Sequence, residues 1–64
     1  MKVKITTATG SHVVEVDRAG GTTEMCKARF LAYIQKARAQ GGYLLDDANF
    51  VPLEAVQMVS IDKY

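Results

Sequence analysis

The sequence predicts a small α+β protein with two layers, in which one amphipathic helix packs on one face of an antiparallel β-sheet. Three observations predict this class: polar and apolar residues alternate over 1–7, an apolar stripe with helical spacing runs through 22–40, and short β-rich segments separated by turn residues fill 43–61. The expected order is therefore ββαββ or ββαβββ. A chain of 64 residues is long enough for one domain only, which we place at 1–64.

The first two segments predict a β-hairpin. Apolar residues occupy every second position over 1–7, which is typical of a strand with one buried face. Turn-forming residues follow at 8–11, where Gly10 can adopt a positive φ. The return strand is expected over 12–17, with Val14 and Val16 on one face.

A helix is predicted over 22–40, after a break in the pattern at 18–21. Thr22 or Thr23 can cap its first turn, and Gly41 with Gly42 ends it. At 100° per residue, the apolar side chains that share one face, and so form the expected core stripe, are Cys26, Phe30, Tyr33, Ile34 and Ala37.

The segment after the helix predicts two or three short strands. Pro52 cannot donate a hydrogen bond to a ladder, so it belongs at the edge or the end of a strand. In order, we expect a strand at 43–45, a turn at 46–49, extended chain at 50–51, a tight turn at 53–55 and a strand at 56–61. The sheet face away from the helix is then open or covered by a second copy.

Composition excludes several classes of protein. A formal charge of +1 and 48% apolar residues exclude a disordered tail and a strongly basic nucleic-acid arm. One cysteine and one histidine cannot form an intramolecular disulfide or supply the four ligands of a structural zinc site. We therefore expect no metal and no cofactor. A single thiol and the absence of an apolar run near 18 residues predict a cytoplasmic protein without a membrane segment.

Small domains are only marginally stabilised by their cores, so self-association as a homodimer or larger assembly is expected. Small side chains on the helix face opposite the core stripe permit close approach of a partner. Alanine is also simply the best helix former on an exposed face, and the sequence leaves both interpretations open. The residues of this predicted interaction face are Met25, Ala28, Leu31, Ala32, Gln35 and Ala39.

Catalytic chemistry is not predicted. Cys26 near the helix start and His12 could in principle pair as nucleophile and base, but Cys26 lies in the centre of the apolar stripe and is better explained as a core residue. Asp46 and Asp47 are better explained by turn formation than by acid–base catalysis. Tyr33 and Tyr43 are expected at the edge of the core, with their hydroxyls reaching water.

Nucleic-acid binding is the alternative function. The predicted helix carries four basic residues against Glu24, which favours contact with a phosphate backbone. These residues divide between two flanks of the core stripe, so a solvated helix is the preferred interpretation. The four are Lys27, Arg29, Lys36 and Arg38.

The layout resembles small proteins of phages and prophages that combine a β-hairpin, a helix and a closing β-element. The likeness rests on the helix exit at Gly41, Gly42 and Tyr43 and on the ending FVPLEAVQMVSI at 50–61. The resemblance implies an accessory protein that binds and modulates a host protein, such as an inhibitor of a host enzyme. The primary prediction is thus a non-catalytic interaction module that acts as a homo-oligomer.

Overall fold

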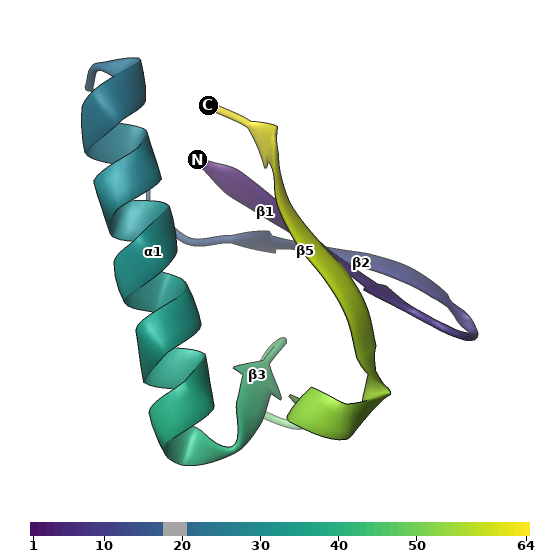
Figure 1. Cartoon of the computed structure of the whole chain (residues 1–64). Helices are drawn as coiled ribbons and strands as arrows, with labels where there is room; N and C mark the ends of the chain where they lie inside the picture. The colour runs from purple at the N-terminus through teal and green to yellow at the C-terminus, as the bar shows by residue number, and fades with distance from the viewer. Residues whose placement is uncertain (18–20) are drawn as a thin grey trace.

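The structure, a computed structural model, describes residues 1–17 and 21–64. Over these residues one helix and five strands follow one another in the order ββαβββ, so the predicted α+β class and element order are confirmed (Figure 1). The elements are β1 (Lys2–Thr7), β2 (Gly10–Glu15), α1 (Thr23–Gln40), β3 (Gly42–Leu44), β4 (Phe50–Pro52), the 3-10 turn η1 (Leu53–Ala55) and β5 (Val56–Lys63).

The strands divide into two antiparallel sheets instead of forming one. β1 lies at the centre of a three-stranded sheet with the order β2-β1-β5, while β3 and β4 pair with each other. Figure 1 shows β3 beside the last turn of α1, below the larger sheet. β3 and β4 are only three residues long, and Pro52 at the end of β4 has no N–H to extend the ladder. The hairpin therefore remains a separate unit.

The β1–β2 ladder is regular and the β1–β5 ladder is not. Six successive residue pairs join β1 to β2 without interruption, from Lys2 opposite Glu15 to Thr7 opposite Gly10. The return strand thus starts two residues before the predicted 12, because the turn is confined to residues 8 and 9 and Gly10 enters the strand with φ 146°. Between β1 and β5 the register shifts twice, after Lys2 and after Thr6.

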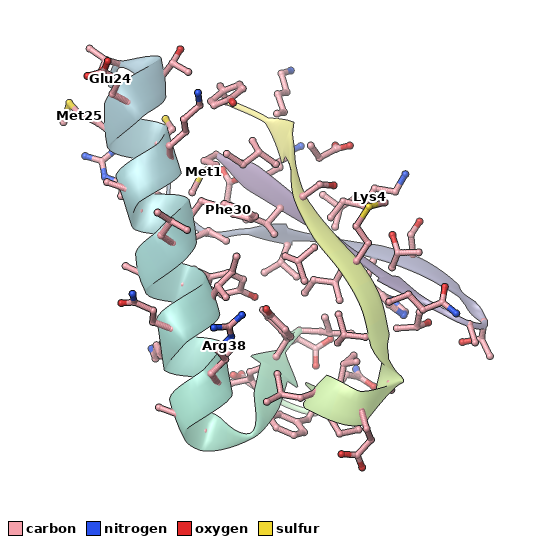
Figure 2. The ribbon with its side chains drawn as sticks, in the orientation of Figure 1. Met1, Lys4, Glu24, Met25, Phe30 and Arg38 are labelled. Atoms are coloured by element: carbon pink, nitrogen blue, oxygen red, sulfur yellow. The ribbon has the colours of Figure 1, made fainter. Side chains whose placement is uncertain are left out.

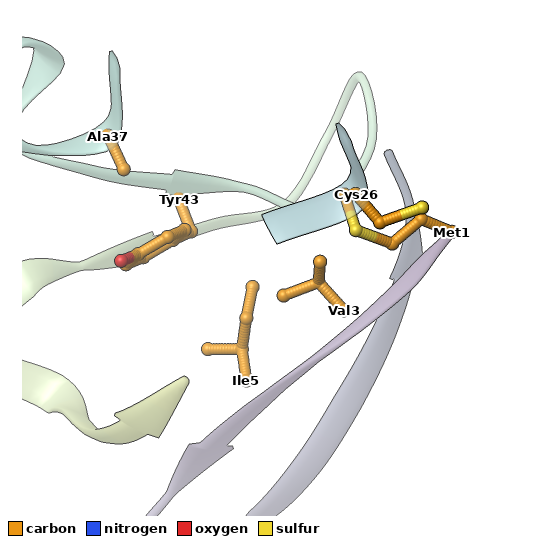
Figure 3. Close-up of a cluster of buried hydrophobic side chains, with 6 residues drawn as sticks. All are labelled: Met1, Val3, Ile5, Cys26, Ala37 and Tyr43. Carbon is orange, nitrogen blue, oxygen red and sulfur yellow. The ribbon is translucent and has the colours of Figure 1, made fainter. Parts of the chain in front are cut away.

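The core lies between the inner face of the larger sheet and α1. Figure 3 shows the side chains of Val3 and Ile5 pointing from β1 toward Cys26 and Tyr43. Val3 and Ile5 are completely buried, as the alternation in the sequence predicts. The predicted core stripe of α1 is also confirmed, since Cys26 and Ala37 are buried and its other members, Phe30, Tyr33 and Ile34, are partly buried.

Both ends of α1 are capped as the sequence predicts. The Thr22 hydroxyl accepts a hydrogen bond of 3.2 Å from the Met25 N–H. Gly41 adopts φ 89° and donates its N–H to the Ala37 carbonyl. The predicted break at 18–21 falls largely on residues 18–20, which lie outside the described part of the chain. In that described part, no helix is long and apolar enough to cross a membrane.

Candidate functional site

The predicted interaction face of the helix points to solvent. Met25 and Leu31 expose 47% and 58% of their surface, and the remaining members, Ala28, Ala32, Gln35 and Ala39, are also exposed. Figure 2 shows Met25 projecting from the first turn of α1 on the side away from the sheet. The placement agrees with the prediction, and self-association through this face stays a prediction.

The four basic residues of the nucleic-acid alternative do not form one patch. Arg29 is partly buried, and its Nε lies 2.8 Å from Oδ2 of Asp17 in an ion pair. Lys36 is exposed on the same flank of α1, and Lys27 and Arg38 are exposed on the other. One of the four charges is therefore already compensated within the protein, and nucleic-acid binding stays a prediction.

The only thiol is a core residue. Cys26 is 3% exposed and packs in the cluster that includes Met1 and Val3 (Figure 3). His12 lies on β2 and is exposed. A buried thiol cannot contact a substrate unless the core opens. In this structure Cys26 is therefore a core packing residue.

A groove runs along the outer edge of β2. Three adjoining hollows share lining residues and connect β2 with α1 and with the turn at 45–49. The middle hollow has a volume of about 360 Å³. We call this feature the β2 groove; the residues that line two of its three hollows are Val14, Val16, Tyr33, Lys36, Leu45 and Asp46.

The edge of β2 that borders this groove offers backbone hydrogen-bonding groups. The Val16 N–H donates to the Met1 carbonyl over 3.0 Å, which identifies the even-numbered residues of β2 as those bonded to β1. The N–H and C=O groups of Ser11 and Val13 then point away from β1. In the described part of the chain no strand pairs with β2 on that side.

Charge is distributed unevenly along the β2 groove. Lys36 lines the part next to the end of β2 at Val16. Asp46 and Asp47 line the middle, and Asp46 continues to the end near His12. Glu15 also lines the middle, and the ion pair of Arg29 with Asp17 lies beside Lys36. The groove therefore has a cation at the Val16 end and carboxylates from its middle to the His12 end, with the apolar side chains of Val14 and Leu45 between Lys36 and Asp46.

Tyr33 differs from the prediction that its hydroxyl reaches water. Tyr43 is 3% exposed, and the Tyr33 hydroxyl is buried without a hydrogen-bond partner in the described part of the chain. Their rings lie 5.5 Å apart between centroids. Burial raises the pKa of both hydroxyls, and the proximity of Tyr43 raises that of Tyr33 further. Tyr43 belongs to β3, so docking of the hairpin of β3 and β4 against α1 places its ring against that of Tyr33.

Tyr33→Phe is expected to stabilise the protein by about 1 kcal/mol, because it removes a buried hydroxyl that has no partner. The free energy of unfolding measured in urea checks this expectation. Tyr64→Phe is the control, because Tyr64 is 59% exposed and its hydroxyl is hydrated in the folded and unfolded chain alike. A loss of stability in Tyr33→Phe would show that the hydroxyl is satisfied.

The turn at 45–49 is held by one carboxylate. Asp46 accepts hydrogen bonds from the backbone N–H of Ala48 at 2.8 Å and of Asn49 at 2.9 Å, and both of its oxygens accept from Nδ2 of Asn49. The bond from Ala48, followed by that from the Asn49 side chain, lowers the pKa of Asp46. The sequence prediction of a turn at 46–49 is confirmed, and this turn forms the anionic wall of the β2 groove.

Asp46 is expected to make folding sensitive to acid. Its carboxylate has a lower pKa in the folded chain than the ordinary 3.8, so its stabilising contribution is complete above that value and is lost as the pH falls through the lowered pKa. Asp46→Asn is therefore expected to be less stable than the parent protein at pH 7, with a difference that shrinks toward pH 2. Urea unfolding over this pH range measures the effect. Asp47→Asn, the same change one residue along, is the control; equal losses in both variants would contradict the prediction.

The β2 groove was not predicted from the sequence. Its walls come from three segments, and their meeting depends on where the hairpin of β3 and β4 docks. One signal was present: Val13 is an apolar residue on the outward face of β2, where its neighbours Ser11 and Glu15 are polar, and it is 53% exposed. Comparison with protein-family models, with curated proteins and with solved structures finds no match for this chain.

Proposed function

We propose that this protein is a non-catalytic interaction module that takes an extended segment of another polypeptide onto the outer edge of β2. The observation that carries the proposal is that the edge of β2 with which no described strand pairs coincides with a groove. The edge supplies main-chain hydrogen bonds, and the groove receives every second side chain of the added strand. This division of roles is general for binding by strand addition.

The β1–β2 ladder favours β2 as the receiving strand. No bulge interrupts its six pairs with β1, so the outward groups of Ser11 and Val13 keep the regular spacing that a further strand requires. Val13 adds an exposed apolar side chain on the outer face of the sheet, where it can pair with a side chain of the added strand. The expectation of a phage accessory protein remains a prediction from the resemblance.

Hydrogen exchange in the free protein tests the edge directly. We expect the amide protons of His12 and Val14, which point toward β1, to exchange slowly, and those of Ser11 and Val13 to exchange near the rate of an unstructured chain. Two-dimensional NMR in deuterated solvent measures each amide separately. Equal protection of Val13 and Val14 would contradict the assignment of the free edge.

Binding is tested with a display library of random twelve-residue peptides. Peptides that bind the folded protein are expected to protect the Val13 amide in the same exchange experiment. Val13→Pro removes the outward N–H but none of the bonds to β1, so it is expected to weaken binding more than tenfold while His12 and Val14 stay protected. Val13→Ala, which keeps the N–H, is the matched control.

A second variant covers the case in which proline disturbs the strand. A chain of 64 residues is accessible to chemical synthesis, so N-methylvaline can replace Val13 and remove the same N–H without fixing φ. It too is expected to lose binding. The proposal is overturned if the library yields no binder, or if the proline and N-methyl chains bind as tightly as the alanine chain.

A further inference from the structure

The distribution of charge in the β2 groove identifies the kind of segment that fits, an inference that rests on the function proposed above. We infer that the partner is an extended peptide that carries a carboxylate, an apolar side chain and a cation at alternate positions, in that order from its N-terminus, and that it binds antiparallel to β2. Strand direction, side-chain alternation and charge together lead to this inference.

The direction follows from strand energetics. β2 runs from Gly10 toward Glu15, so it starts near the anionic end of the groove and finishes near the cationic end. All the strand pairs described are antiparallel, and antiparallel pairing is the more stable per residue. An antiparallel partner therefore enters at the cationic end with its N-terminal part and leaves at the anionic end.

Alternation decides which side chains of the partner enter the groove. Residues directly opposite one another in a ladder point to the same face of the sheet. His12 and Val14 of β2 line the groove, as does Val16 directly after the strand, so the partner residues opposite these three enter it too. The intervening side chains of the partner lie on the outer face, where they meet Val13.

Charge then assigns a chemical type to each of the three positions. The partner residue opposite Val16 lies next to Lys36. At this end the charges of Arg29 and Asp17 compensate each other, so the charge of Lys36 remains and favours a carboxylate on the partner. The residue opposite Val14 meets Leu45 and is apolar. The residue opposite His12 lies next to Asp46, which favours a cation. Glu15 also lines the middle hollow, and its Oε2 lies 3.9 Å from the N-terminal ammonium of Met1, which compensates part of its charge.

A second copy of β2 fits this pattern less well. If two β2 strands pair antiparallel with Val13 opposite Val13, the added strand places Gly10 opposite Val16 and His12 opposite Val14. No carboxylate then meets Lys36. We therefore assign the groove to a different polypeptide, and sedimentation of the protein without peptide reports any pairing of copies.

Synthetic peptides of about nine residues test the inference. The matching peptide carries Glu, Val and Lys at alternate positions, and a second peptide carries Lys, Val and Lys there. The protein is expected to bind the matching peptide three- to fivefold more tightly, which is the range for a partly exposed ion pair. Lys36→Glu is expected to reverse this preference. Lys27→Glu makes the same charge change on the other flank of α1 and is expected to leave it intact.

The outcomes separate this inference from the proposed function. Library peptides that bind through the Val13 edge without any preference between the two synthetic peptides, or a preference that Lys36→Glu leaves unchanged, would overturn the inference and leave strand addition standing. Pairing of copies through β2 that excludes all peptides would also overturn it. Absence of binding by every peptide would overturn both.

Discussion

Gly42→Ala is expected to destabilise the protein by about 3 kcal/mol, because β3 and β4 approach too closely for any side chain at this position. A Cβ atom on Gly42 would lie 2.2 Å from the Val51 carbonyl oxygen and 2.8 Å from Cα of Pro52. Both contacts are with backbone atoms of β4, which move only if the hairpin opens. Urea unfolding measures the loss of stability. Peptide binding is expected to weaken as well, since the hairpin positions one wall of the β2 groove.

The neighbouring glycine supplies the control. Gly41 caps α1 at φ 89°, but a Cβ there would meet nothing within 4 Å. Gly41→Ala is therefore expected to cost only about 1 kcal/mol, the strain of a left-handed residue. If the two variants were equally stable, the close approach of β3 and β4 would not be the cause.

Ile5→Ala is expected to cost about 3 to 4 kcal/mol, a large part of the stability of a domain of this size. Ile5 is completely buried in the middle of the central strand, where it packs in the same cluster as Val3 and Tyr43. Alanine at this position leaves a cavity between the sheet and the helix. Circular dichroism and urea unfolding are expected to show a largely unfolded chain at 37 °C.

Two further substitutions serve as controls for the loss of stability in Ile5→Ala. Ile5→Val removes a single methylene and is expected to cost about 1 kcal/mol. Lys4→Ala changes the adjacent residue, whose side chain points to the outer face, and is expected to stay within about 0.5 kcal/mol of the parent. A small loss in Ile5→Ala would contradict the position of the core.

The parts of the fold that follow from local interactions were predictable from the sequence. Helix α1 is specified by the Thr22 cap, by Gly41 at its end and by an apolar stripe, and all three signals lie within one continuous segment of the sequence. The first strand is likewise specified by alternation, because a shift by one residue would expose Val3 and Ile5. The turn at 46–49 was predictable from its turn-forming residues, since Asp46 and Asn49 form hydrogen bonds within the turn itself.

The parts that depend on distant contacts were not predictable. No local signal separates β3 and β4 from the larger sheet, because three-residue strands have too few side chains to specify a partner. The burial of the Tyr33 hydroxyl depends on this docking and was missed with it. The β2 groove requires the same docking, so sequence reasoning directed attention to the exposed helix face instead.

The unequal regularity of the two outer strands sets the stoichiometry of the proposed complexes. A molecule with two equally receptive edges would join others into an endless fibril. On the β5 side, however, the register shifts leave only four regular pairs, from Val3 opposite Ile61 to Thr6 opposite Met58, compared with six on the β2 side. Such irregularities twist an edge away from further pairing. We therefore expect each molecule to accept one strand, and the proposed complexes to form at a ratio of one to one.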